Sequence, residues 1–505
     1  MQRIKQTAIR IYGWLELRLQ LEGPVKDAAL HSVPRNTASW WYVFGSAAFT
    51  LLFLQIFTGI LLALVYVLSA GEAWNSLNIL NHQIPLGWFL HAMHGWGSNF
   101  MVAIVLIHMA QVFLFGAYKF PRELTWIVGV FLLLMTLGMA FTGQVLRFDQ
   151  DAYWGLGIGA SIVSRVPYIG GGLVHLLLGG PIISGPTLSR FFALHVFVIP
   201  GALLLFVFLH VWMVLKLGIN EWPMPGRLVQ RSTYIQQYHQ LAHEDGIPFV
   251  PGAFWKDLIF SGAVLAAVAV CAFVFGPFGP SGQPDPSIIQ TVPKPDFFFL
   301  WIYTILSYLP PAMETPFILI VPLLGIAFLL ALPFWAAEGE KSWHRRPVAL
   351  LAVSTIAVCW GVLTHLGAST PWSPHMSAWS SDPIPVHYLQ NATPLVRQGA
   401  AVFQAKQCRN CHSIGGAGGE RGPALDDVAT TMTIDQLRFK VVTGGGNMPA
   451  YGKNLSPAEI EAVVSFLETL HPANEPPAYD ASRRAVETSQ AVDGAPKPAN
   501  RNAAP

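Results

Sequence analysis

Seven stretches of the chain are apolar and long enough to cross a lipid bilayer, which takes roughly 20 helical residues. They lie near residues 40–68, 88–116, 124–146, 190–217, 254–279, 316–337 and 346–366. Because the bilayer core offers no water to backbone N–H and C=O groups, a spanning segment must close its hydrogen bonds internally, as a helix does. The sequence therefore predicts an all-α membrane protein with seven transmembrane helices. A shorter apolar run, Phe297–Leu309, predicts a re-entrant or surface segment.

The charge content supports this interpretation. Asp, Glu, Lys and Arg make up 11% of the 505 residues, against roughly 25% in soluble domains. The net charge of +2 leaves no basic excess of the kind that binds nucleic acid. Residues 371–505 carry 23 of the 58 charged side chains, so the pattern predicts a long membrane part followed by a short soluble part.

Basic residues predict how the spans are oriented. Fifteen Lys and Arg side chains fall on one side of the spans, and four fall on the other: Arg147, Arg165, Arg190 and Lys294. The basic side of a membrane protein faces the cytoplasm. We therefore expect a cytoplasmic N-terminus and, after an odd number of spans, a C-terminal part on the outer or periplasmic side of a bacterial cytoplasmic membrane.

Composition divides the chain into six parts. We expect an inner-surface segment (1–39), a four-helix bundle (40–235), a three-helix part (236–370), a linker (371–394), a compact helical domain (395–472) and a disordered tail (473–505).

The compact domain opens with a haem-attachment motif. In Cys408-Arg-Asn-Cys411-His412, two thiols one turn apart can bond one haem and the next residue can reach its iron. The alternatives are a chance pentapeptide or a zinc site, but no further zinc ligands lie nearby in the sequence. The motif therefore predicts one covalent haem c, with Cys408 and Cys411 as attachment sites and His412 as an iron ligand.

Met448 is our candidate for the second iron ligand of this haem. It lies 36 residues after His412 and follows three glycines, and a thioether ligand raises the reduction potential. A packing methionine is the alternative, and His471 and Met432 are rival ligands. Pro423 is expected to support the His412 ring.

Four histidines occur inside two of the predicted spans. His94 and His108 are 14 residues apart, and His195 and His210 are 15 apart. Fourteen residues make nearly four helical turns and rise about 21 Å, so each helix presents two imidazoles on nearly one face at two depths. A single structural histidine bonded to backbone is the alternative for each, but polar side chains in lipid are costly and usually functional. We predict two non-covalent haem b groups, ligated by His94 with His195 on the outer side and His108 with His210 on the inner side.

Glycines repeat the same spacing on the neighbouring spans. Gly45 and Gly59 are 14 residues apart, as are Gly129 and Gly143. A flat macrocycle needs a site without a side chain where it meets a helix, although single glycines also serve helix packing. The matched spacing predicts one four-helix bundle that holds both haems. His91, one turn before His94, is not expected to be a ligand.

Several segments of residues 10–370 resemble cytochrome b of the Rieske/cytochrome b complexes, the bc1 and b6f types. The closest are Pro121–Trp126, Thr142–Leu146 and Thr187–His195. The 15-residue spacing and seven spans resemble the b6f type with its subunit IV fused on, and Arg345–Ala349 is similar to that subunit. Residues 395–472 resemble a class I cytochrome c.

The resemblance implies oxidation of quinol at an outer site. One electron goes to a separate Rieske iron–sulfur protein and on to cytochrome c, and the other crosses both b haems to quinone at an inner site, with proton translocation. Asp296, in Pro295-Asp296-Phe297-Phe298, stands where the family has a glutamate at the quinol site. By this resemblance Asp296 is a proton-accepting base, and an aspartate at this position favours menaquinol as the substrate. The alternative interpretation is a solvated aspartate in a loop.

The resemblance also implies partners, and some positions of this chain differ from the family pattern. We expect a homodimeric complex, a downstream cytochrome or other oxidant, and, because Val43 replaces a cysteine, no covalently attached third haem. Arg190 is the best candidate to contact a haem propionate. At the inner quinone site Lys216, Glu221 and Asp27 could donate protons, but we interpret each as a solvated surface charge.

Two rival functions use the same haem motifs. A di-haem b membrane anchor would pass electrons between a soluble subunit and quinone without sending them two ways. An electron conduit would lack quinol turnover. The Asp296 segment and the fused haem c domain favour a quinol–cytochrome c oxidoreductase subunit over both.

Overall fold

The computed structural model contains the seven expected transmembrane helices. It describes residues 5–7, 10, 16–17, 23, 26, 29–180, 183–285, 293–369, 383–406, 408–410, 412–418, 422–444, 448, 450–452 and 455–478. The spanning helices are α3 (Phe44–Ala63), α5 (Gly87–Leu114), α6 (Glu123–Leu146), the continuous run of α9 (Gly185–Ala193), η2 (Leu194–Val198) and α10 (Ile199–Leu217), α13 (Phe254–Phe275), α15 (Pro311–Trp335) and α16 (Pro347–Ser369). The predicted fold class, all-α with seven spans, is confirmed.

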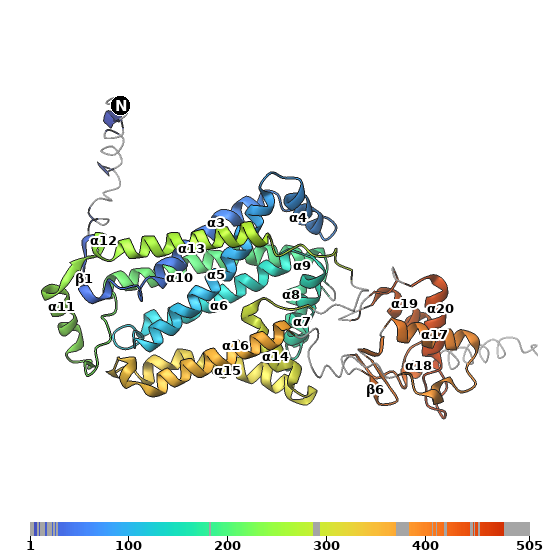
Figure 1. Ribbon diagram of the computed structural model, residues 1–505. Helices are drawn as coiled ribbons and strands as arrows, with labels where there is room; N and C mark the ends of the chain where they lie inside the picture. Colours follow the sequence, from blue (N-terminus) through green and yellow to red (C-terminus); the bar gives the residue numbers. More distant parts are fainter. Residues whose placement is uncertain are drawn as a thin grey trace, which may run out of the picture. The chain divides into compact units, whose positions relative to one another are not determined.

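Shorter elements gather at the two ends of the spanning helices (Figure 1). At one end lie η1 (Arg35–Thr37), α11 (Tyr234–Glu244), α12 (Phe249–Gly252), η3 (Trp343–Arg345) and two antiparallel pairs, β1 (Ser32–Pro34) with β3 (Gly246–Pro248) and β2 (Leu228–Val229) with β4 (Gly339–Glu340). At the other end lie α4 (Ala73–His82), α7 (Gln150–Ser164) and α8 (Gly170–Leu178). The positively charged loops belong to the first end, which we call the inner end; the second is the outer end.

The first four spans pack in pairs. Helix α3 lies along α5 and α6 lies along α10, while α13 packs on α3 and α5. Their shared core includes Ala47, Leu51, Met101, Leu203 and Val268. Helix α14 (Phe297–Tyr308) is too short to span a bilayer and packs along α16. These contacts leave α5, which carries His94 and His108, facing the fourth span, which carries His195 in η2 and His210 in α10.

The fourth span contains one turn of wider helix. Residues Leu194–Val198 form a π-helical turn, which places one extra residue in the helix, just before Pro200. Proline has no N–H to donate to the preceding turn and disturbs the regular ladder there, and π-turns recur at functional sites. The extra residue explains why His195 and His210 are 15 apart whereas His94 and His108 are 14 apart.

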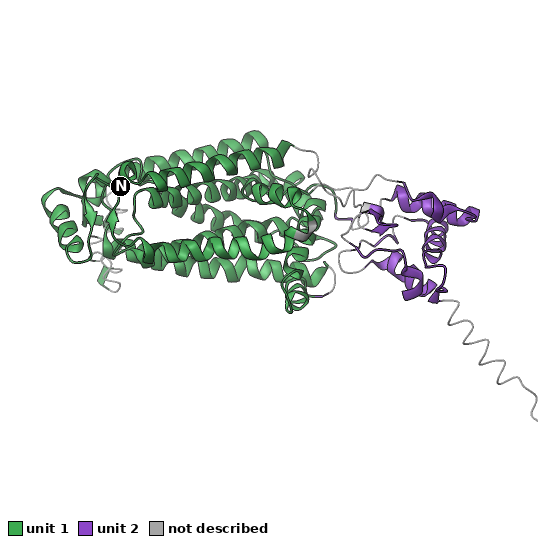
Figure 2. Cartoon of the chain, turned by 90° about the horizontal axis from the view of Figure 1, so that it is seen from below, with its two compact units in different colours: residues 1–179, 183–283, 293–369 green, residues 180–182, 284–292, 370–505 purple. Residues whose placement is uncertain are grey.

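The C-terminal part of the chain forms a second compact unit (purple in Figure 2). Its elements are η4 (Val386–Leu389), α17 (Pro394–Ala405), η5 (Cys408–Asn410), the hairpin β5 (Ser413–Ile414) with β6 (Ala417–Gly418), α18 (Val428–Thr431), α19 (Ile434–Thr443) and α20 (Pro457–Glu468). Thr393, Thr433 and Ser456 cap the helices that follow them. The backbones of α17 and α20 approach so closely at Gly399 that any side chain there would overlap Ala462. Residues 479–505 of the expected tail lie outside the described residues.

Candidate functional site

The outer histidine pair meets between α5 and the π-turn of the fourth span. The ring centroids of His94 and His195 are 6.3 Å apart, at an interplanar angle of 78°. Two metal–imidazole bonds of about 2 Å each, on opposite sides of one metal, bring ring centroids to about 6 Å. The observed separation therefore fits an iron held between the two rings.

Two threonines fix which ring nitrogen faces the pair. The Thr58 hydroxyl donates to the carbonyl of Leu54 at 2.7 Å and lies 2.8 Å from Nδ1 of His94. Thr142 donates to the carbonyl of Gly138 at 2.8 Å and lies 3.0 Å from Nδ1 of His195. Since each hydroxyl hydrogen is engaged by a carbonyl, its oxygen accepts from Nδ1–H. This tautomer leaves Nε2 of both rings unprotonated, as a metal ligand must be.

We predict that Thr142→Val weakens haem binding at the outer pair. The substitution keeps the side-chain shape but leaves the buried Nδ1–H of His195 without an acceptor, and losing such a partner typically costs about 10–100-fold in metal affinity. Haem retention through detergent washing and the midpoint potential of the outer haem measure the effect.

Thr136→Val is the matched control for that substitution. Thr136 makes the same kind of bond, to the carbonyl of Leu132 at 2.8 Å on the same helix, but has no hydrogen bond to a histidine among the described residues. Equal haem loss in both variants would mean that the threonine acts on the helix rather than on His195.

The four glycines each approach one histidine ring. A methyl group added to Gly59 would lie 3.3 Å from Cε1 of His94, and one added to Gly143 would lie 2.7 Å from Cε1 of His195. At the inner pair, the same distances are 3.4 Å from Gly45 to His108 and 3.6 Å from Gly129 to His210. Helix α3 thus abuts the histidines of α5, and α6 abuts those of the fourth span.

These distances predict different outcomes for two substitutions on one helix. Gly143→Ala places a methyl group inside the contact distance of the His195 ring, so we expect loss of the outer haem. Gly129→Ala leaves an ordinary van der Waals separation, so we expect both b haems to remain. Reduced-minus-oxidised difference spectra of membranes give the haem content, and loss of a haem from both variants would contradict the assignment.

The inner pair offers fewer partners from the chain. Nδ1 of His108 is buried and has no hydrogen-bond partner among the described residues. A buried ring nitrogen without a hydrogen-bond partner costs free energy of folding. The His108 ring is therefore suited to a binding role, here to a haem, rather than to a purely structural one. Sequence reasoning missed a carboxyl that bonds to the neighbour of Gly45: Ser46 donates to Oδ1 of Asp257 at 2.8 Å. Asp257 lies in the first turn of the apolar span α13. An acidic residue at such a place was the signal that could have drawn attention to it.

The C-terminal unit orients its own histidine in the same way. Nδ1 of His412 donates to the carbonyl of Pro423 at 2.8 Å, and a side chain at Gly422 would overlap the ring. Burial lowers the pKa of His412, so the ring is neutral and Nε2 can bind iron. Cys408 lies partly buried beside the hydrophobic core of the unit, and Cys411 lies outside the described residues.

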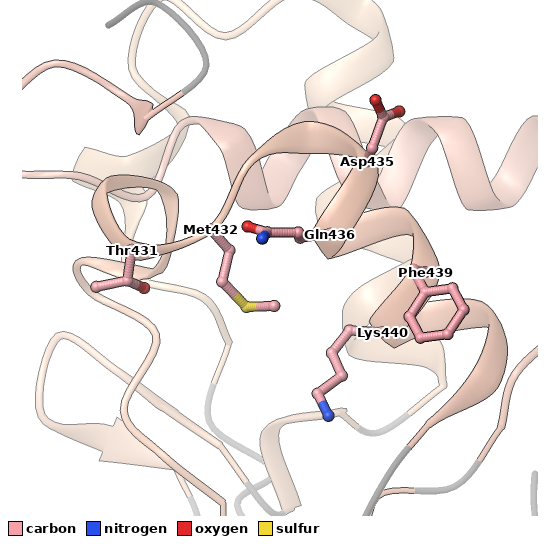
Figure 3. A pocket seen from close by; sticks show the side chains of 6 residues that line it. All are labelled: Thr431, Met432, Asp435, Gln436, Phe439 and Lys440. Carbon is pink, nitrogen blue, oxygen red and sulfur yellow. The ribbon is translucent and has the colours of Figure 1, made fainter. Parts of the chain in front are cut away.

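No contact among the described residues joins His412 to one of the three candidate second ligands. Met448 is partly buried. His471 places Nδ1 3.0 Å from the carbonyl of Pro472. Figure 3 shows the Met432 thioether directed into a cavity of about 440 Å³ that Phe439 and Lys440 also line. The second ligand therefore stays a prediction, with Met448 preferred.

Asp296 occupies the position before the first residue of α14 and is half-buried. Burial raises the pKa of its carboxyl, and Arg147 opposes that rise. Arg147 itself pairs with the fully buried Asp149 at 3.4 Å. A carboxylate with a raised pKa is better matched to accept a proton near neutral pH than a solvated one.

The structure places the other predicted residues as follows. The guanidinium of Arg190 donates to the backbone carbonyls of His175 and Leu176. Lys216 is exposed, as expected, and Asp27 lies outside the described residues. The interpretation of Glu221 as a solvated charge is wrong: it is 1% exposed and paired with Arg227 and Lys341.

Comparison with known proteins agrees with this geometry. The family model "Cytochrome b/b6/petB" matches residues 30–218. The cytochrome b subunit of the menaquinol:cytochrome c reductase of Geobacillus thermodenitrificans is 36% identical over 218 residues, which cover 42% of this chain and 97% of the relative. The chain belongs to the cytochrome b/b6 family. It is accordingly a multi-pass membrane protein of electron transport.

Other similarities extend beyond the first four spans. Cytochrome b/c1 of Bradyrhizobium diazoefficiens is 31% identical over 366 residues, which cover 71% of this chain and 50% of the relative, so this chain spans half of that protein. A solved structure named "Hyperthermophilic respiratory Complex III" aligns with a TM-score of 0.58 and 26% identity, covering 71% of this chain and 91% of that one. The model "Cytochrome C oxidase, cbb3-type, subunit III" matches residues 394–467. The expected fusion of a cytochrome b to a cytochrome c domain is confirmed.

Proposed function

We propose that this chain is the cytochrome b and c subunit of a menaquinol–cytochrome c oxidoreductase that sends the two electrons of each quinol along separate routes. The paired histidines carry the proposal, because their spacing fits two iron sites at two depths of the bundle, and the ring separation and tautomer of the outer pair fit a bound iron. The name of the Geobacillus relative supports menaquinol as the substrate.

Each haem has a defined set of residues in this proposal. His94 and His195 hold the outer haem b, His108 and His210 hold the inner haem b, and Cys408, Cys411, His412 and Met448 hold haem c. The haems supply one-electron transfer when bound. Thr58 and Thr142 keep the outer rings oriented, and the four glycines let α3 and α6 approach the ligating histidine rings.

Asp296 is the base of the outer site. Quinol gives up two protons and two electrons there; the Asp296 carboxylate accepts one of the protons, and the other is released on the outer side. A separate Rieske protein takes one electron for the c domain, and the other electron crosses to quinone at the inner site, which takes up protons from the cytoplasm. We place the complex, as a homodimer, in a bacterial cytoplasmic membrane with the c domain outside.

Purification of the intact complex through this chain tests the proposal. We expect two b haems for each c haem, and reduction of the c haem by a short-chain menaquinol that is faster than with a ubiquinol analogue. A complex that contains all its haems but passes no electrons from either quinol to the c haem would contradict it.

A further inference from the structure

A buried ionic network lies at the inner end, beyond the helix that carries His210. Glu221 is 1% exposed and Lys341, from the loop between α15 and α16, is 2% exposed. Arg227 binds Glu221 with two contacts, Nε to Oε1 at 3.0 Å and Nη2 to Oε2 at 2.8 Å, and Lys341 Nζ lies 3.5 Å from Oε1. The Arg227 side chain is 30% exposed, so the network reaches solvent at this edge.

The network continues from Lys341 to the hydroxyl group of Tyr234. Lys341 Nζ donates to the hydroxyl of Tyr234 at 2.9 Å, and Arg122 donates to the same oxygen at 3.4 Å. Because the Tyr234 oxygen accepts from both cations, its own hydroxyl hydrogen remains available to donate to a further acceptor. Arg122 also donates to the carbonyls of Leu217 and Gly218. Leu217 lies seven residues, about 10 Å of helix, beyond His210.

One hydroxyl close to this network has no partner. The Tyr42 hydroxyl is buried without a hydrogen bond to any described residue, and so is Oδ1 of Asn220, the neighbour of Glu221. Burial raises the pKa of Tyr42, and Glu221, Tyr234 and Tyr238 add to the rise while Arg122 opposes it. Tyr42 therefore carries its proton and lies within electrostatic reach of the network.

Tyr42 is also close to the inner histidine pair. Tyr42 lies three residues before Gly45, and Gly45 abuts the His108 ring. Its ring packs against Phe115 at 5.7 Å, just beyond the end of the helix that carries His108. A protonated, unpartnered donor at this place is suited to a carbonyl oxygen of a bound quinone.

We propose that Glu221, Lys341 and Tyr234 form a proton-delivery path from the inner face to Tyr42, which donates to the oxygen of quinone reduced at the inner site. The inference rests on the proposed function. The Tyr42 O–H bond breaks as the quinone O–H bond forms, and Tyr234 restores the Tyr42 proton across a bridging water. The Lys341 ammonium restores Tyr234, and solvent protons entering beside Arg227 and Glu221 restore Lys341. Each quinone gains two electrons and two protons in two such cycles.

The groups around Lys341 support this role over a purely structural one. Burial lowers its pKa to about 7, with Arg122 and Arg227 adding to the fall and Glu221 opposing it. Lys341 can therefore release and regain a proton near neutral pH. An ion pair that only joins the two halves of the membrane part would require neither this property nor the unpartnered Tyr42 hydroxyl.

Tyr42→Phe in the native complex tests the last step. In membranes supplied with a short-chain menaquinol, b haem is first reduced from the outer site and then reoxidised by quinone at the inner site. We expect reoxidation to slow by at least about tenfold and to stay slower in heavy water than in ordinary water, because proton delivery then limits the rate. Tyr118→Phe, which removes the bond of another inner-end phenol to Arg346 at 2.8 Å, is the matched control and should reoxidise normally. Wild-type reoxidation in Tyr42→Phe would overturn the proposal.

Lys341→Arg separates proton transfer from structure. Arginine keeps the positive charge beside Glu221 but does not release a proton near neutral pH. We expect slowed reoxidation despite a complete haem content, and a normal rate would assign Lys341 a structural role and overturn the path. If b haem in the wild-type complex never shows the initial reduction, the proposed function itself fails, which is a distinct result from a normal rate in the variants.

Discussion

Replacing His195 with asparagine is expected to remove the outer b haem and to lower quinol oxidation by more than about 100-fold. Substitutions that only disturb the partner of a metal ligand cost about 10–100-fold, and this one removes the ligand itself. The facing ring of His94, 6.3 Å away, would remain as a single ligand. Difference spectra of reduced and oxidised membranes should show about half of the haem b of the wild type and unchanged haem c.

His91→Asn is the control for this experiment. His91 lies one turn before His94 on the same helix, and its Nδ1 lies 3.0 Å from the side-chain oxygen of Asn81. It faces no second histidine in the way that His94 does, so both b haems should remain. Full haem b in the His195 variant, or loss of a haem from the His91 variant, would show that the ligands are wrongly assigned.

Replacing Asp296 with asparagine is expected to slow quinol oxidation by about 10²–10⁴-fold while all three haems remain. That range is the usual contribution of a positioned general base. Asn keeps the size of the side chain but cannot accept the proton. Asp296→Glu restores a carboxylate, although one methylene longer, and should recover part of the rate. Steady-state reduction of the c haem by a short-chain menaquinol measures both.

The pH dependence gives an independent check on Asp296. Only the ionised carboxylate can act as the base, so activity is lost as the pH falls through its pKa. Burial raises that pKa, which moves the acid limb of the rate profile above the ordinary aspartate value of about 3.9. The Asn variant should lack this limb. An unchanged rate and profile in Asp296→Asn would leave the residue as a loop aspartate.

The sequence predicted those features that depend on local pattern. Apolar length alone located all seven spans, because lipid forces the backbone of such a run into a helix. The spacing of the histidines and glycines predicted which residues share a helix face. In the structure each of these glycines abuts the histidine at the same depth, Gly59 with His94 and Gly45 with His108 among them.

Features that depend on distant parts of the chain were missed. The π-turn at His195 results from the neighbouring Pro200 within a packed bundle, and helical periodicity does not reveal it. Glu221 was taken for a surface charge because its partner Lys341 lies 120 residues away. The Ser46–Asp257 bond joins residues 211 apart. The repeated Thr-Gly pairs, Thr58-Gly59 and Thr142-Gly143, were a usable signal for the oriented rings.

Oxidant-induced reduction tests whether one quinol sends its two electrons along separate routes. The wild-type complex is supplied with a short-chain menaquinol while its inner site is inhibited, the c haem is oxidised rapidly, and the b-haem absorbance is followed. We predict a transient rise in reduced b haem as the c haem is oxidised. Oxidation of b haem together with the c haem would contradict it and would identify the haems as a single chain.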